Sequence, residues 1–187
     1  MKQLIIIAGR TGSGKTTLCR HLSEAFGAPI ISFSSLARKF ANQHGYSSIR
    51  RCFFDMGTKE FTESIGEYIL NDIEKEKSAD MLILDGLYIF NILDYLKNRY
   101  KTTIFSLNTE EKTCVERISR RLGISKEKAL SEYMVKEDIK TALGNELLLQ
   151  IADYSLDGNK PVDESVSKII SIIMFISFSF NNCYLYG

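Results

Sequence analysis

Short runs of consecutive apolar residues alternate along this chain with longer segments in which apolar residues recur every three or four positions. The runs are typical of strands buried on both faces, and the longer segments are typical of amphipathic helices. We predict strands at QLIII (3–7), APIIS (28–32), MLILD (81–85), TTIFSL (102–107) and DYSL (153–156). We predict helices at 16–26, about 35–43, 58–77, 89–100, 110–122, 126–143 and from 161 onward.

The order of these elements predicts the fold class. Gly27 and Gly123 are expected to end two of the helices, and Ser125 is expected to cap the next one. Asn108 and Glu111 have the spacing of a capping box for the helix at 110–122. Because parallel strands need crossover connections that cover both sheet faces, the alternation predicts a three-layer α/β/α fold with a five-stranded parallel sheet.

Composition narrows the class of protein. The chain has 187 residues, of which 44% are hydrophobic and 25% charged, and it shows no repeat or linker, so we expect one domain over residues 1–187. The formal charge is only +1, so we expect no nucleic-acid partner. The four cysteines lie far apart and without metal-ligand spacing, and the first residues lack a secretory pattern. These features predict a cytoplasmic protein.

The C-terminal segment 169–187 contains no charged residue. Its firmly apolar part, 169–180, is about twelve residues long, whereas a bilayer-spanning helix needs roughly twenty. We expect a packed last helix followed by a strand or an unstructured tail. A membrane anchor or interfacial segment is the less favoured alternative.

The stretch GRTGSGKTT, residues 9–17, follows the first predicted strand and opens the first predicted helix. It fills every fixed position of the pattern G-x-x-x-x-G-K-[ST], whose glycines let backbone N–H groups turn toward an anion at a helix N-terminus. A triphosphate fits such a loop. We therefore predict ATP-binding residues at Gly9, Thr11, Gly12, Ser13, Gly14, Lys15, Thr16 and Thr17. Lys15 is also expected to act in catalysis by contacting the β- and γ-phosphates.

Asp85 ends the third predicted strand, at the sheet edge where ligands of open α/β sheets bind. A carboxylate there can hold the water shell of Mg²⁺ while the Thr16 hydroxyl joins that shell. We therefore predict Thr16 and Asp85 as a magnesium site, with Asp85 also counted as catalytic. The other interpretation is that Asp85 caps a following helix.

Arg117, Arg120 and Arg121 have the spacing of one helical face. Such guanidinium groups can bind phosphate oxygens and stabilise their charge during transfer, so Arg117 and Arg121 are candidate catalytic residues and Arg117 a candidate nucleotide ligand. The simpler alternative is that basic residues near a helix C-terminus complement the helix dipole.

In GRTGSGKTT, LILDG, CVERISRRLG and IADYSLDGN, the chain resembles the P-loop nucleotide kinases of the adenylate kinase and dephospho-CoA kinase group, over about 1–173. The resemblance implies their P-loop NTPase fold, ATP and Mg²⁺ as cofactors, and a helical lid at about 122–143. It also implies that Asn159 and Lys160, in the loop after the last strand, border the adenine. DGLYIFNILDYLKN and DIKTALGNELLLQIADYSLDGN are more similar to the poorly characterised dephospho-CoA kinase-like proteins than to adenylate kinase proper.

The segment SFSSLAR departs from the adenylate kinase pattern, which has Gly-Asp after the second strand and then an arginine for the acceptor phosphate. Only Arg38 is kept, and Ser34 lies at the replaced position; we predict both as acceptor-binding residues. Asp55, in a predicted loop, is the nearest candidate general base, and Lys136 and Lys140 occupy positions where lid arginines are common.

These features predict an ATP-dependent phosphotransferase whose acceptor is nucleotide-like or dephospho-CoA-like. Catalysis would depend on positioning and charge stabilisation and would need no nucleophilic side chain. The alternatives are a regulatory ATPase without a small-molecule acceptor, and a membrane-tethered protein. Its partners would be ATP and a small phosphate acceptor.

Overall fold

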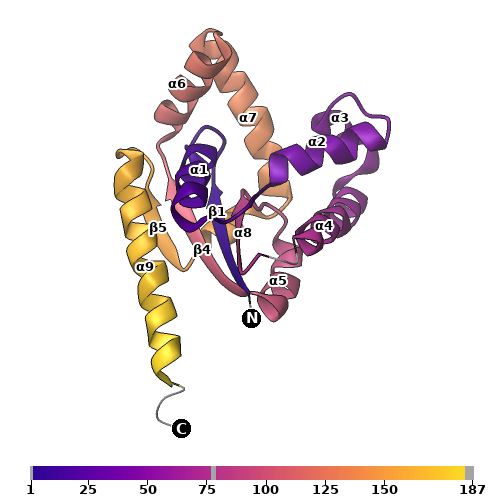
Figure 1. Cartoon of the computed structure of the whole chain (residues 1–187). Coiled ribbons are helices and arrows are strands. Elements are labelled where there is room, and N and C mark those ends of the chain that lie inside the picture. The colour runs from indigo at the N-terminus through magenta and orange to yellow at the C-terminus, as the bar shows by residue number, and fades with distance from the viewer. Residues whose placement is uncertain (1, 77–78, 184–187) are drawn as a thin grey trace.

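Five parallel strands form the centre of the computed structural model, which describes residues 2–76 and 79–183 (Figure 1). The strands are β1 Gln3–Gly9, β2 Ile30–Ser32, β3 Met81–Asp85, β4 Lys101–Asn108 and β5 Tyr154–Asp157. They pair in parallel in the order β2-β3-β1-β4-β5. The chain therefore has the predicted five-stranded parallel sheet, with the phosphate loop after the central strand.

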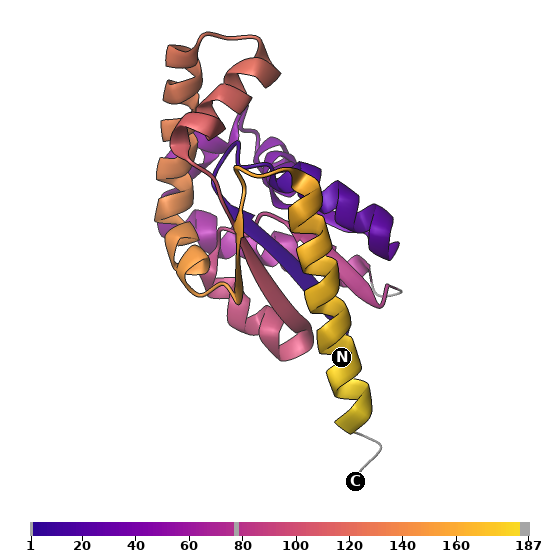
Figure 2. The ribbon, with the colours of Figure 1, turned by 90° about the vertical axis from the view of Figure 1, so that its left-hand side faces the viewer.

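Helices cover both faces of the sheet, as predicted for continuous apolar strands (Figures 1 and 2). The helices are α1 Lys15–Phe26, α2 Phe33–Gln43, α3 Ile49–Met56, α4 Thr58–Lys75, α5 Leu93–Arg99, α6 Glu111–Leu122, α7 Lys126–Ala142, α8 Asn145–Gln150 and α9 Val162–Cys183, and a 3₁₀ turn, η1, spans Phe90–Ile92.

Alternate residues of β1 belong to two different hydrophobic cores, because successive side chains of a strand point to opposite faces. Leu4 and Ile6 pack with residues of α2, α4, α5 and α8, whereas Ile5 and Ile7 pack with residues of α1 and α9. A third, smaller cluster joins α6 to α7 and contains Ile118. The central strand is thus held from both sides, and this fixes the point from which the phosphate loop begins.

Two predictions of local structure were wrong. Asp55 lies on helix α3 and not in a loop; the Ser48 hydroxyl caps this helix by accepting a hydrogen bond from the Arg51 N–H at 3.2 Å. The capping box at Asn108 does not form, because Asn108 remains in β4 and its amide donates to the Ser155 hydroxyl at 2.8 Å. α3 and α8 were not predicted, since helices this short give little periodic signal.

The signals at other helix ends were correct. Gly27 and Gly123 end α1 and α6 in the left-handed conformation, with φ of 62° and 65°. The Ser125 hydroxyl accepts a hydrogen bond from the Lys128 N–H and caps α7.

Helix α9 contains most of the uncharged C-terminal segment and continues to Cys183. Ile169 and Ile173 are buried against the core, as expected for a packed last helix, while Met174 and Phe175 are exposed. The end of the predicted tail, 184–187, lies outside the described residues. Among the residues that are described, no helix combines the length and hydropathy expected of a membrane span.

We predict that Phe61→Ala lowers the free energy of unfolding by about 3–5 kcal/mol, the usual cost of a large cavity in a core. Phe61 is fully buried, and its ring lies edge-on to Phe40 and Phe53 at centroid distances of 5.9 and 5.4 Å. Urea denaturation measures the loss. Phe54→Ala, at a side chain that is 63% exposed on α3, is the control and should change stability by about 0.5 kcal/mol or less.

Candidate functional site

The phosphate loop connects β1 to α1 in a conformation that depends on glycine. Gly12 and Gly14 have φ of 79° and 106°, a region in which other L-residues are strained. A Cβ on Gly12 would also lie 2.6 Å from the Cys114 carbonyl oxygen of α6. The glycines therefore allow the loop both to turn its N–H groups inward and to pack against α6.

The structure brings the predicted magnesium ligands together across 69 residues of sequence. The Thr16 hydroxyl donates to Asp85 Oδ2 at 2.7 Å, and Asp85 is only 5% exposed. Hydroxyl and carboxylate oxygens are ligands that suit Mg²⁺, so the donor set fits this ion. The alternative role of Asp85 as a helix cap is wrong, because residues 86–89 are not helical.

Lys15 lies over the loop that precedes it. Its ammonium donates to the Arg10 carbonyl at 2.7 Å and to the Ser13 hydroxyl at 3.4 Å. Burial and then the neighbouring Lys140 charge lower the pKa of Lys15 to about 7, although Asp85 and Glu137 oppose this shift. A bound anion would therefore stabilise the charged form of Lys15.

Helix α7 contributes an ion pair that the sequence analysis missed. The Glu137 carboxylate accepts hydrogen bonds from the Thr11 N–H at 2.7 Å, the Thr11 hydroxyl at 2.6 Å and the Lys140 ammonium at 2.9 Å. Both charged side chains are largely buried, with exposures of 13% and 8%. Only the i, i+3 spacing of opposite charges was visible in the sequence, and that spacing occurs on many helices.

The titration of this pair follows from its surroundings. Burial raises the pKa of Glu137, but Lys140 and Thr11 together lower it by a larger amount, so the net shift is downward. Burial lowers the pKa of Lys140, and the Glu137 charge opposes that change. The lowered pKa favours the anionic form of Glu137, which contacts Thr11 of the phosphate loop.

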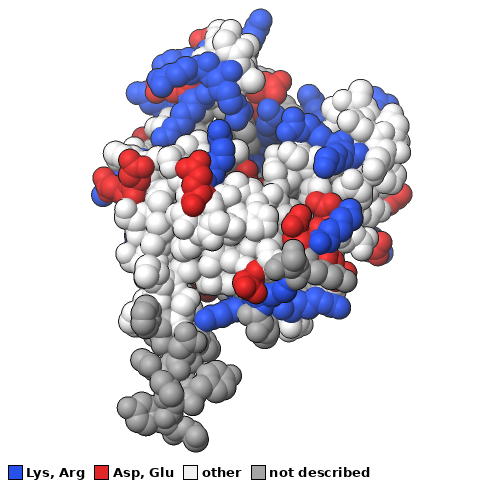
Figure 3. All heavy atoms as spheres, viewed as in Figure 1, with Lys and Arg blue, Asp and Glu red and all other residues white. Residues whose placement is uncertain are grey.

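A cavity of about 580 Å³ opens along the phosphate loop. It is lined by residues 12–18 and by Arg20, Leu107, Arg117, Arg121, Gly158, Lys160, Val162 and Ser165. Figure 3 shows basic side chains gathered over α6 and the start of α7, beside this region. Segments far apart in sequence thus bring loop N–H groups and several cations to one cavity.

Arg117 is fixed by two backbone carbonyls. Its guanidinium donates to the Ser13 oxygen at 2.8 Å and to the Gly158 oxygen at 2.9 Å, joining the phosphate loop to the loop after β5. Arg117 is not in the last turn of α6, so the helix dipole does not explain it; that interpretation fits only Arg120 and Arg121. Of those two, Arg121 lines the cavity.

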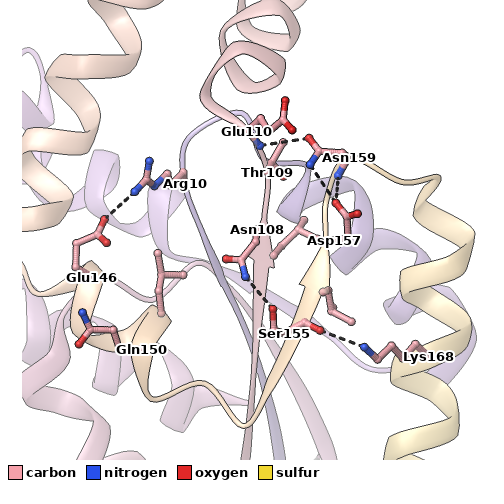
Figure 4. Close-up of a pocket in the computed structure, with 13 residues that line it drawn as sticks. Arg10, Asn108, Thr109, Glu110, Glu146, Gln150, Ser155, Asp157, Asn159 and Lys168 are labelled. Atoms are coloured by element: carbon pink, nitrogen blue, oxygen red, sulfur yellow. Dashed lines mark hydrogen bonds and ion pairs between the residues drawn. The ribbon is translucent and has the colours of Figure 1, made fainter.

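Asn159 and Lys160, which were predicted together, face different cavities. Asn159 accepts a hydrogen bond from the Glu110 N–H and donates to Asp157, and it lines a second cavity of about 720 Å³ beside β4, β5 and α8 (Figure 4). Other polar groups there also pair with one another, as Arg10 does with Glu146 at 3.7 Å. Its lining includes neither Lys15 nor Asp85.

The predicted acceptor residues lie on α2. Arg38 is exposed and donates to the Ser34 carbonyl oxygen at 3.2 Å, while the hydroxyls of Ser34 and Ser32 lie 3.3 Å apart. Asp55, the candidate base, forms an ion pair with Arg51 at 2.7 Å and lines neither of the two cavities described above.

Comparison with known proteins relates this site to a family. The model of a family described as an AAA domain matches residues 8–134, which is more than half of the chain. A cytidylate kinase from Ignicoccus hospitalis is 26% identical over 143 residues, covering 73% of this chain and 75% of that protein. A cytidylate kinase from Pyrobaculum calidifontis is 25% identical over 191 residues, covering 97% of each.

A solved structure shares the fold. A shikimate kinase from Bacteroides thetaiotaomicron aligns with a TM-score of 0.63 at 14% identity, covering 92% of this chain and 98% of that one. At this identity the likeness concerns the arrangement of strands and helices.

We predict that binding of Mg²⁺ with a non-hydrolysable ATP analogue takes up about one proton at pH 8. With a pKa of about 7, Lys15 is mostly uncharged at pH 8, and a bound phosphate anion would restore its charge. Calorimetry in buffers of different ionisation enthalpy measures the uptake. It should disappear at pH 6, where Lys15 is already charged, and fall sharply in Lys15→Met; equal uptake in that variant would contradict the assignment.

We predict that Glu137→Ala lowers the free energy of unfolding by about 2–4 kcal/mol, because the Thr11 N–H loses its acceptor and the buried Lys140 ammonium keeps only a 3.5 Å hydrogen bond to the Gly9 carbonyl oxygen. Denaturant unfolding measures the change. Glu132→Ala, which removes an exposed ion pair with Lys136 on the same helix, should cost about 0.5 kcal/mol or less. Equal losses in the two variants would show that the Glu137 contact does not form.

Proposed function

The chain belongs to the AAA-domain family, whose model matches residues 8–134, and on this premise we propose that it is an ATP-dependent phosphotransferase. The observation that carries the proposal is the hydrogen bond from Thr16, the last residue of a complete phosphate-loop pattern, to Asp85. A hydroxyl and a carboxylate at this place suit a nucleotide that arrives with a divalent cation.

The chain's own residues would bind and orient ATP. The loop N–H groups and Lys15 would hold the phosphates, and Arg117 and Arg121 would add positive charge from α6. Lys160 would border the base from the loop after β5. Thr16 and Asp85 would hold Mg²⁺, and the chemistry that this ion would supply is neutralisation of charge on the β- and γ-phosphates.

We propose a nucleotide-like acceptor, with cytidine monophosphate as the first candidate. The support is that the two curated relatives described above are named cytidylate kinases, at 26% and 25% identity. Arg38 and Ser34 on α2 are the proposed acceptor residues. We further propose residues 122–143, which include α7, as a lid over the bound nucleotide.

Incubation with ATP, Mg²⁺ and a panel of nucleoside monophosphates, followed by product separation, tests the proposal. A new phosphorylated product is expected, whereas slow hydrolysis alone would indicate a regulatory ATPase. Lys15→Ala should lower the transfer rate about 10²-fold or more, because a cation on the transferred phosphate is lost. Lys97→Ala, at an exposed position on α5, is the matched control and should leave the rate unchanged. Normal turnover by Lys15→Ala would refute the role of Lys15.

A further inference from the structure

Tyr88 lies where three parts of the proposed site meet. Its ring centroid is 4.0 Å from that of Phe33, at the start of α2, and the Lys140 ammonium of α7 lies 5.0 Å from its centroid. Gly86, directly after β3, marks where the side chains of Tyr88 and Lys15 approach each other. A Cβ atom added to Gly86 would lie 3.7 Å from the Tyr88 hydroxyl oxygen and 3.5 Å from Cε of Lys15. The hydroxyl and the stem of Lys15 therefore approach the same point beside β3.

The hydroxyl is the part of Tyr88 that is free to bind a ligand. Phe33 and Lys140 contact the ring, whereas the hydroxyl forms no hydrogen bond within the described part of the chain. Tyr95 differs in this respect, because its hydroxyl donates to Glu74 at 2.6 Å. A phenol held by its ring with its hydroxyl unpaired is suited to donate a hydrogen bond to a ligand.

The charges around Tyr88 indicate what kind of ligand would be bound. Lys15, Lys140 and Arg38 supply positive charge from three different elements. The carboxylates that act on Tyr88, Asp85 and Glu137, already accept hydrogen bonds from Thr16, and from Thr11 and Lys140. A neutral hydrogen-bond donor that is surrounded by cationic side chains is suited to bind an anion with several oxygen atoms.

The same two carboxylates, Asp85 and Glu137, also indicate which class of acceptor can react. An alcohol acceptor has to lose its proton to a base during transfer, and the two carboxylates that act on Tyr88 both already accept hydrogen bonds. A phosphate monoester is largely ionised at neutral pH and brings its own nucleophilic oxygen. That oxygen forms the new bond to the γ-phosphorus, the bond from the γ-phosphorus to its bridging oxygen breaks, and the electron pair leaves with ADP, so no proton has to be removed.

We propose that Tyr88 is a specificity-determining residue of the acceptor site, and that its hydroxyl donates a hydrogen bond to the phosphate of a monoester acceptor. The proposal rests on the proposed phosphotransferase function and deepens it, because it favours a nucleoside monophosphate over an alcohol such as dephospho-CoA. Burial and the nearby carboxylates raise the pKa of Tyr88, which keeps the hydroxyl protonated as a donor.

Steady-state kinetics with Tyr88→Phe tests this role, since the change removes one oxygen and keeps the ring against Phe33. With ATP and CMP, UMP, AMP or GMP, the KM for the monophosphate should rise about 10-fold or more, the usual effect of losing a hydrogen bond to a charged group. The KM for ATP should change less than about twofold, because the hydroxyl is proposed to bind the acceptor and not ATP. Tyr95→Phe, the matched control, should leave both KM values unchanged.

Three results would overturn the proposal: an unchanged monophosphate KM in Tyr88→Phe, an equal rise in the KM for ATP, or efficient transfer to dephospho-CoA by wild type and Tyr88→Phe alike. Thermal unfolding of both Phe variants shows whether they are folded. A rise in the monophosphate KM with an unchanged melting temperature would exclude a purely structural role for Tyr88.

A second measurement separates failure of this proposal from failure of the proposed function. If the wild-type chain transfers phosphate to none of the monophosphates, the phosphotransferase proposal fails. Calorimetric binding of CMP, with Mg²⁺ and a non-hydrolysable ATP analogue present, then tests Tyr88 directly. Weaker binding by Tyr88→Phe than by wild type supports the residue's role; equal binding, or none by either protein, overturns it.

Discussion

The hydrogen bond between Thr16 and Asp85 joins the first turn of α1 to the end of β3, and the site depends on this contact. Thr16 lies in the first turn of α1, directly after the phosphate loop, and Asp85 ends β3, the neighbour of the central strand β1. Because Asp85 is almost fully buried, its carboxylate needs a donor or a cation, and the Thr16 hydroxyl supplies the donor. The parallel register of β1 and β3 sets this contact, so the packing of the sheet positions the proposed metal ligands.

Compensation of charge around the phosphate loop is the second constraint on the site. The charges of Lys15 and Lys140 repel each other, and this repulsion contributes to the lowered pKa of Lys15. Glu137 supplies a compensating negative charge and also holds α7 against Thr11. A triphosphate that binds here would add further negative charge beside the two lysines. The proposed lid helix and the phosphate loop thus share one electrostatic network.

Prediction from the sequence was most successful for helix ends, where a single residue acts on the backbone next to it. The glycines at 27 and 123 end helices, and Ser125 caps one, because these effects depend on the backbone within a few residues. The capping box at Asn108 was wrong, since pairing with Ser155 of β5 keeps that residue in β4. Asp55 was placed in a loop because an eight-residue helix shows too little periodicity.

The amino-acid sequence by itself determined the order of the five strands, most of the helices and the position of the phosphate loop. Periodicity and motif spacing carry this information, because strand burial and loop conformation are largely local properties. Only the tertiary structure decided which distant side chains meet: Glu137 with Thr11 across 126 residues, Arg117 with the loops on both sides of the cavity, and Tyr88 with Lys140. Such contacts depend on how packed helices are oriented on the sheet, and no local spacing along the chain encodes that orientation.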